Sequence, residues 1–114
     1  MSRNKADQQR LDRIHDMPCV ACVARNVEQP FNTEAHHIVT NGYRRLSGGH
    51  QATIPLDSWH HRGLCLPGLT AKQMEAKYGP SLALSKRSFV KVFGTELELL
   101  EQIDVDLKTS PKIR

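Results

Sequence analysis

The sequence predicts a small α+β domain, on the evidence of three features of the 114-residue chain. Two short segments with β-branched residues, 35–39 and 52–56, flank a loop that contains Asn-Gly and Gly-Gly pairs, and they predict two strands. The last third carries three helical patterns with capping and stop signals. In addition, four of the six histidines form two adjacent pairs, one in the first predicted strand and one after the second.

The chain length suits a single domain over 1–114, because so short a chain cannot bury two independent cores. The predicted segments are an N-terminal arm at 1–17, a core at 18–66, a helical appendage at 67–107 and a frayed tail at 108–114. Only 5% of the residues are aromatic, so the apolar core is thin and a structural metal ion would help to stabilise it.

The charge is basic, with 16 Lys and Arg against 12 Asp and Glu, a net charge of +4 and a pI of about 9.2. This balance suits a polyanionic partner such as nucleic acid, although many proteins are mildly basic. No apolar run approaches the roughly 20 residues that span a bilayer, and the polar N-terminus is unlike a signal peptide. We therefore expect a cytoplasmic protein, in which three cysteines favour metal binding over disulfides.

Helices are predicted on both sides of the strands. At 7–16, two apolar residues lie on one side of a charged stretch, and Asp57 or Ser58 caps a short helix that ends at Arg62. The predicted C-terminal helices span 71–78, 85–93 and 96–107. Thr70 caps the first of them, Gly94 ends the second, and Thr95 with Glu98 forms a capping box for the third.

Cys19 and Cys22 have the spacing of a zinc knuckle, in which a turn directs both thiolates at one ion about 2.3 Å away. A polar loop is expected between this knuckle and the first strand. The remaining ligands must come from elsewhere, and the candidates are Asp57, His60 and Cys65. Zinc accepts sulfur, nitrogen and oxygen ligands, whereas a redox pair would need a thioredoxin-like βαβ context that this sequence lacks. The spacing therefore predicts a structural zinc site.

The two histidine pairs, His36-His37 and His60-His61, point to further metal chemistry. Adjacent residues on a strand face opposite sides, so one imidazole can bind an ion while its neighbour acts elsewhere. A single pair is more simply explained as two surface histidines. Two pairs joined by a glycine-rich loop favour a metal site.

Longer stretches of the chain carry a family resemblance. The segment at 35–50 reads AHHIVTNGYRRLSGGH and leads on to the His-Arg pair at 61–62, and YGPSLAL follows at 78–84. These segments resemble the phage Ref (recombination enhancement function) family of RecA-dependent nucleases, within the His-Asn-His (HNH) endonuclease superfamily. The resemblance implies a small zinc-stabilised ββα-metal (HNH-type) core, in which a hairpin and a helix hold one divalent ion, with additional C-terminal helices.

The resemblance also implies roles for individual residues. His36 and His61 would hold the catalytic ion, His37 would be the general base that activates water, and Cys65 lies where some relatives place another ligand. Mg²⁺ and Zn²⁺ are both candidates for the catalytic ion, because imidazole favours zinc while phosphoryl chemistry commonly uses magnesium.

The sequence departs from the HNH pattern at two places. The middle Asn of the motif would fall near Ala52, and its candidate replacements are Gln51, His50 and Asn41. The second knuckle reads Asp57-x-x-His60 where many relatives have two cysteines. The fourth ligand of the structural zinc therefore stays open.

Three arginines lie beside these motifs: Arg44, Arg45 and Arg62. Guanidinium groups match phosphate oxygens, so we expect at least one of the three to contact DNA. No base-reading helix is recognisable, which predicts little sequence specificity. The resemblance implies that a RecA filament directs the protein to DNA, single-stranded or paired in a displacement loop.

Two other functions fit part of this pattern. A zinc-stabilised DNA-binding module without catalysis explains the cysteines, the histidines and the charge, but it does not need His37 beside His36. A metal-stabilised protein that recruits RecA would bind RecA and never cut DNA. A metalloprotease is disfavoured, because no His-Glu-x-x-His motif occurs.

Overall fold

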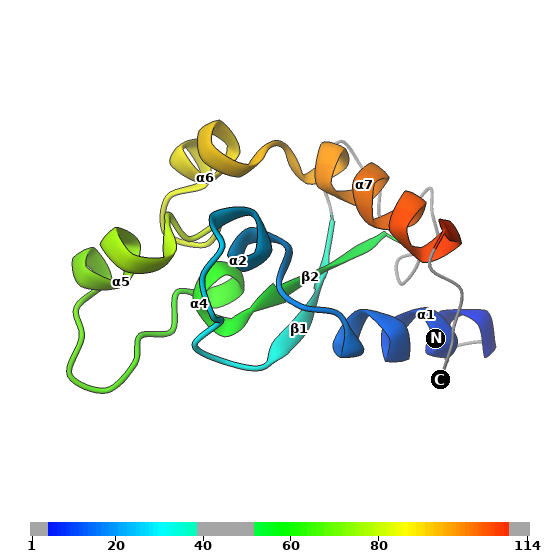
Figure 1. Cartoon of the computed structure of the whole chain (residues 1–114), viewed down its shortest axis with the longest axis horizontal. Coiled ribbons are helices and arrows are strands. Elements are labelled where there is room, and N and C mark those ends of the chain that lie inside the picture. The colour runs from blue at the N-terminus through cyan, green and yellow to red at the C-terminus, as the bar shows by residue number, and fades with distance from the viewer. Residues whose placement is uncertain (1–4, 39–51, 110–114) are drawn as a thin grey trace.

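The computed structural model describes residues 5–38 and 52–109 and confirms the predicted α+β class (Figure 1). Its elements are α1 (Lys5–Asp16), α2 (Val20–Arg25), β1 (Thr33–His37), β2 (Thr53–Asp57), α4 (Ser58–Arg62), α5 (Ala71–Tyr78), α6 (Lys86–Phe93) and α7 (Glu96–Thr109). The predicted helices at both ends of the chain are present with small changes of boundary. Ranges 39–51 and 110–114 lie outside the described residues, and the predicted Gly-rich loop falls within the first of them.

The helix α2 is absent from the sequence prediction, which placed a loop after the cysteine pair. It has only six residues, too few to show a helical period, and Cys19 at its N-cap makes no side-chain capping hydrogen bond. Its end is marked by Asn26, which adopts the left-handed conformation at φ 60° and closes the helix through its backbone N–H. The cysteine pair thus lies at the start of a helix.

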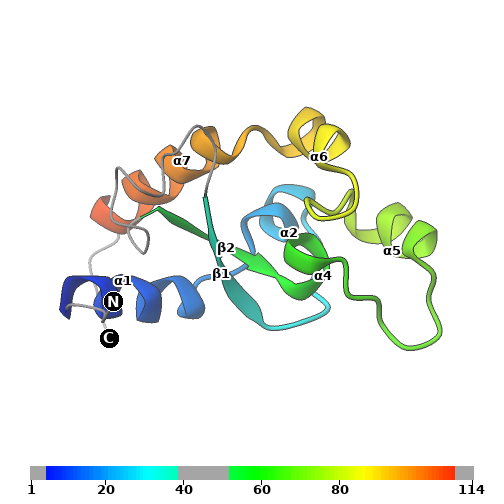
Figure 2. The same cartoon turned by 180° about the vertical axis from the view of Figure 1, so that it is seen from behind.

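The two strands pair antiparallel, with His36 opposite Ile54 and His37 opposite Thr53. All five residues of β2 are buried, whereas those of β1 are partly exposed. This difference arises because four helices, α1, α2, α4 and α7, pack against β2, with α7 on one side of the sheet and α1 on the other (Figures 1 and 2). The strand with the adjacent histidines is therefore the one that reaches the surface.

The C-terminal helices share the core of the sheet. Phe89 of α6 and Leu99, Leu100 and Ile103 of α7 belong to the same buried cluster as Ile54 and Leu56 of β2. A second, smaller cluster joins Trp59 of α4 to Met74 and Tyr78 of α5. Three other apolar residues of this region, Leu84, Val92 and Leu97, are exposed.

A single arginine ties three elements together. Arg10 of α1 donates through Nε to Thr53 Oγ1 at 3.0 Å and through Nη2 to the Thr53 carbonyl at 2.7 Å. Its Nη1 also pairs with Asp104 of α7 at 2.8 Å. These bonds fix α1 and α7 against the end of β2 that adjoins His37 in the sheet register.

The described helices include none that is both long and apolar enough to cross a membrane.

Replacing Phe89 by Ala should lower the free energy of unfolding by about 3–5 kcal/mol, because it empties a fully buried site between α6 and the sheet. Val92→Ala on the same helix is the matched control: its side chain is 54% exposed, so its effect should stay within about 0.5 kcal/mol. Urea denaturation measures both variants. An equal loss of unfolding free energy in the two variants would show that α6 is not part of the core.

Candidate functional site

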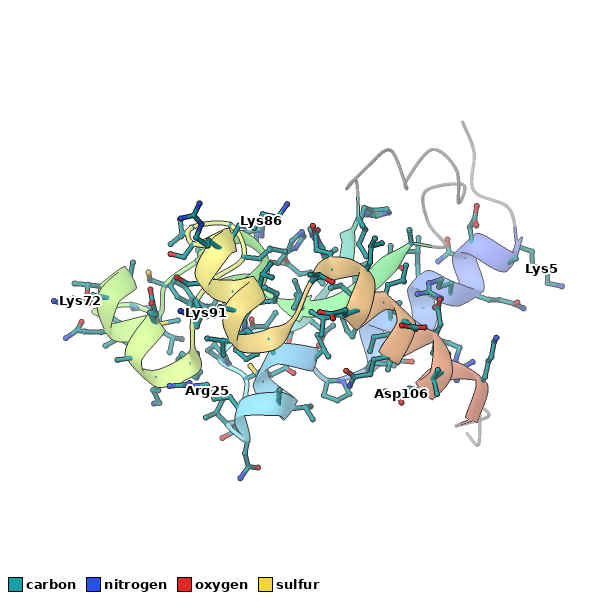
Figure 3. All side chains as sticks on the ribbon, turned by 90° about the horizontal axis from the view of Figure 1, so that it is seen from above. Lys5, Arg25, Lys72, Lys86, Lys91 and Asp106 are labelled. Carbon is teal, nitrogen blue, oxygen red and sulfur yellow. The ribbon has the colours of Figure 1, made fainter. Side chains whose placement is uncertain are left out.

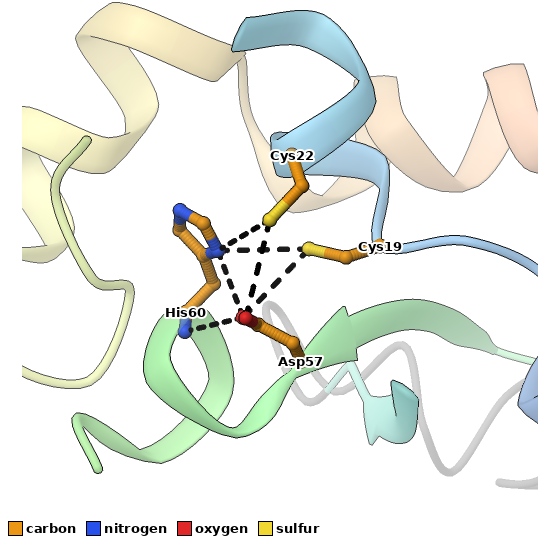
Figure 4. A group of neighbouring side chains, drawn as sticks. All are labelled: Cys19, Cys22, Asp57 and His60. Atoms are coloured by element: carbon orange, nitrogen blue, oxygen red, sulfur yellow. Dashed lines mark hydrogen bonds and ion pairs between the residues drawn. The ribbon is translucent and has the colours of Figure 1, made fainter. Parts of the chain in front are cut away.

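Two pairs of residues that lie far apart in the sequence meet in one buried cluster: Cys19 and Cys22, and Asp57 and His60 (Figure 4). One ligand atom from each lies within 4.8 Å of those from the other three, and all four residues are buried. Cys19 and Cys22 come from the start of α2, Asp57 ends β2, and His60 lies in α4. We call this group the C2DH cluster.

Local structure explains why Asp57 and His60 belong together. Asp57 is the N-cap of α4, and its Oδ1 accepts a hydrogen bond from the backbone N–H of His60 at 2.9 Å. The same oxygen lies 2.9 Å from Nδ1 of the His60 ring. Capping therefore fixes the carboxylate and the imidazole in one turn, facing the two sulfurs.

The His60 ring has a defined orientation. Its Nε2 lies 2.8 Å from the carbonyl oxygen of Tyr78, which can only accept, so Nε2 carries the hydrogen. Nδ1 then faces the sulfurs of Cys19 at 3.6 Å and Cys22 at 3.7 Å. A ligating histidine normally donates its second N–H to a carbonyl or carboxylate in this way.

The electrostatics of the C2DH cluster require a positive charge. A hydrogen bond from Cys22 lowers the pKa of Cys19 to about 5, although burial opposes this shift. The same hydrogen bond raises the pKa of the Cys22 thiol. Burial lowers the pKa of His60, but hydrogen bonds to Asp57 and Cys19 outweigh it and raise the pKa to about 9. A proton on His60 and a proton on Cys22 offset the buried negative charge, and a divalent cation would do the same.

The donors of the C2DH cluster fit a metal site. Two sulfurs, one imidazole nitrogen and one carboxylate oxygen are enough ligands for a closed four-coordinate site. Of the candidates that the sequence left open, the structure brings Asp57 and His60 to the cysteines. It does not bring Cys65, which is only partly buried and whose sulfur lies 3.9 Å from the carbonyl of Gly63.

A second group of polar side chains lies where β1 meets α4. The rings of His36 and His61 have centroids 5.0 Å apart in an edge-to-face arrangement. His37 lines a pocket of about 350 Å³ together with His61, Arg62 and Glu34, and α1 supplies the facing wall through Gln8, Leu11 and His15. His61 is thus next to His36 through its ring and shares the pocket with His37, whereas His36 is not among the residues that line the pocket.

Each of the two facing imidazoles has a carboxylate partner. Nδ1 of His61 lies 2.8 Å from Oε1 of Glu34, and Nε2 of His36 lies 2.6 Å from Oε2 of Glu96. Because a carboxylate accepts, these contacts place the hydrogens on Nδ1 of His61 and Nε2 of His36. Nε2 of His61 and Nδ1 of His36 are then the ring nitrogens with a lone pair for an ion.

The histidines fit a second ion less completely than the C2DH cluster fits the first. Two imidazoles 5.0 Å apart are compatible with one shared ion. Within 5–38 and 52–109, however, no other set of three ligand atoms meets the spacing that the C2DH cluster meets. Several predicted site residues lie outside the described residues. They are the three candidate replacements for the motif's Asn, namely Asn41, His50 and Gln51, and the arginines Arg44 and Arg45.

Glu34 is a site residue that the sequence analysis missed. It accepts hydrogen bonds from Ser58 Oγ at 2.6 Å and from Arg62 Nη2 at 2.9 Å, in addition to its contact with His61. Burial raises its pKa, but these hydrogen bonds outweigh that effect and lower the pKa to about 2. Strand alternation was the available signal, since Glu34 lies two residues before His36 and thus on the same face.

Arg62, a predicted DNA contact, is engaged in part by this carboxylate. Its side chain is 58% exposed, and its Nε and Nη2 donate to Glu34 at 3.1 and 2.9 Å. The guanidinium lies at the rim of the histidine pocket. It is held there and still reaches solvent.

Replacing Cys22 by Ala should abolish binding of the metal ion at the C2DH cluster and lower the melting temperature, because it removes a buried ligand. Cys65→Ala is the matched control and should keep its metal. Metal analysis of purified protein, with thermal unfolding before and after chelation, measures both. Metal loss on Cys65→Ala, or full metal content in Cys22→Ala, would contradict the assignment.

Ionised Glu34 should stabilise the folded protein at neutral pH, because its pKa is lowered from 4.5 to about 2. This contribution is present above a pH of about 4.5 and is lost as the pH falls toward about 2. The stability difference between wild type and Glu34→Gln should therefore shrink over that interval. Urea denaturation at several pH values tests this, and a constant difference would speak against an ionised Glu34 in the folded state.

The sequence was also compared with protein families, curated proteins and solved structures. No match was found among curated proteins or among solved structures. Residues 4–107 match the family described as "Recombination enhancement, RecA-dependent nuclease". This match covers nearly the whole chain, including both polar clusters, and it agrees with the resemblance inferred from the sequence. The chain therefore belongs to the family of RecA-dependent nucleases that act in recombination enhancement.

Proposed function

We propose that this protein is a metal-dependent DNA endonuclease of the HNH class that is directed to DNA by a RecA filament. The observation that carries the proposal is the position of His61 of α4, whose ring lies 5.0 Å from that of His36 and which shares a pocket with His37, in a chain of a nuclease family. The order of two strands followed by a helix with the histidines at their junction supports the ββα-metal architecture.

His37 is the general base in this proposal. A neutral imidazole with a pKa of about 6.5 can take a proton from water at cellular pH. The position of His37 in a pocket open to solvent gives water and a phosphodiester access to its ring. At least one of the three arginines Arg44, Arg45 and Arg62 contacts DNA phosphates, and Arg62 lines this pocket.

Two metal sites belong to the proposal. The C2DH cluster binds a structural zinc, because thiolates and imidazole favour zinc among the common ions. His36 and His61 hold the catalytic ion, Mg²⁺ or Zn²⁺, with Nδ1 and Nε2 respectively. When bound, this ion polarises the phosphate and neutralises charge on the leaving oxygen.

The surface charge supports a nucleic-acid partner. Exposed lysines of α5 and α6, among them Lys72, Lys86 and Lys91, project from the end of the molecule opposite to α1 (Figure 3). Such a surface attracts phosphates without reading bases. A RecA filament, on single-stranded DNA or in a displacement loop, then supplies the targeting, and it would place the activity in the bacterial cytoplasm.

Replacing His37 by Ala should lower the cleavage rate by about 100-fold to 10,000-fold while DNA binding is kept, because only the base is removed. The assay uses single-stranded DNA coated with RecA, with and without a paired duplex, in Mg²⁺. Metal content and melting temperature of the variant control for folding.

The outcomes separate the candidate functions. Cleavage by wild type but not by His37→Ala supports the nuclease and its base. Equal DNA binding with no cleavage by either protein would favour the DNA-binding module, and RecA binding without cleavage would favour the recruiting protein.

A further inference from the structure

Glu96, in the first turn of α7, is a buried acidic side chain that packing does not account for. The residue is 6% exposed, and α7 contributes leucines and an isoleucine to the core around it. The start of α7 is already capped by Thr95 and Glu98, whose side chains exchange hydrogen bonds with each other's backbone N–H groups at 3.1 and 2.8 Å. Burial of a carboxylate costs free energy unless it is paired, so this position would favour an apolar residue if packing alone decided it.

The contacts of Glu96 point to the histidines. Its Oε2 lies 2.6 Å from Nε2 of His36, a short charge-assisted distance, and its Oε1 lies 3.4 Å from Nζ of Lys86. Lys86 is the first residue of α6, so α7 contacts the strand histidine through Glu96, and α6 contacts Glu96 in turn. The Glu34–His61 pair repeats the arrangement on the other side, with the two rings 5.0 Å apart.

We propose that Glu96 is a positioning residue that sets the tautomer and the orientation of His36. By accepting the hydrogen of Nε2, it leaves the lone pair on Nδ1, which becomes the ligand atom for a divalent cation. Lys86 offsets part of its charge and holds its second oxygen. The inference rests on the proposed role of His36 as a metal ligand, and it makes α6 and α7 part of the site.

The test measures metal binding separately from cleavage. Protein with its C2DH cluster filled by zinc is titrated with Mn²⁺, and binding is followed by calorimetry and by electron paramagnetic resonance. Glu96→Ala should weaken Mn²⁺ binding by about 10-fold to 100-fold. Glu96→Gln, whose amide carbonyl still accepts a hydrogen bond, should lose less. Glu101→Gln is the matched control, an exposed acidic residue on the same helix, and should bind as wild type does.

A second measurement reports the tautomer of the His36 ring. Nitrogen-15 imidazole spectra of the zinc-filled protein without Mn²⁺ should show the hydrogen of His36 on Nε2 in wild type, and a mixture of tautomers in Glu96→Ala. Zinc content and melting temperature separate this effect from unfolding. A purely structural role for Glu96 would change the melting temperature and leave the His36 tautomer as it is.

Three outcomes would overturn the proposal: wild type binds no Mn²⁺ beyond the zinc site, Glu96→Ala binds it as tightly as wild type does, or His36→Ala leaves binding intact. The proposed nuclease function fails differently. If wild type binds Mn²⁺ and Glu96→Ala weakens that binding, but neither cuts DNA on a RecA filament, then Glu96 positions His36 in a metal site that is not a nuclease centre.

Discussion

The buried charge of the C2DH cluster is the constraint on which the rest of this structure depends. Two sulfurs, a carboxylate and an imidazole lie within 4.8 Å of one another, and both cysteines belong to the main buried apolar cluster. Such a group is stable only when a cation or protons compensate it, and it then links α2, the end of β2 and α4. One ion bound there would bridge three elements of the fold.

The same cluster fixes the neighbouring histidine site. His60 is turned inward by its bonds to Asp57 and to the carbonyl of Tyr78, so His61 faces the opposite way, toward Glu34. The two adjacent histidines of α4 thus point in different directions. His60 belongs to the buried C2DH cluster, whereas His61 lies beside His36 and lines the pocket that His37 also lines.

Much of this arrangement was predictable where local signals exist. Capping residues and glycines located the helices of the last third, and the Cys-x-x-Cys spacing indicated which cysteines act together. The short helix α2 escaped prediction because six residues carry too little period. Cys65 was indistinguishable from a ligand in sequence, since only the path of the chain after α4 keeps its sulfur away from the cluster.

The sequence by itself determined the element types, the knuckle, the paired histidines and the family resemblance, because each depends on residues close together in the chain. Only the tertiary structure decided which of Asp57, His60 and Cys65 joins the cysteines, and that Glu34 and Glu96 face the histidines. Glu96 lies 60 residues beyond its partner His36. No local sequence pattern predicts this contact, because the packing of α7 on the sheet creates it.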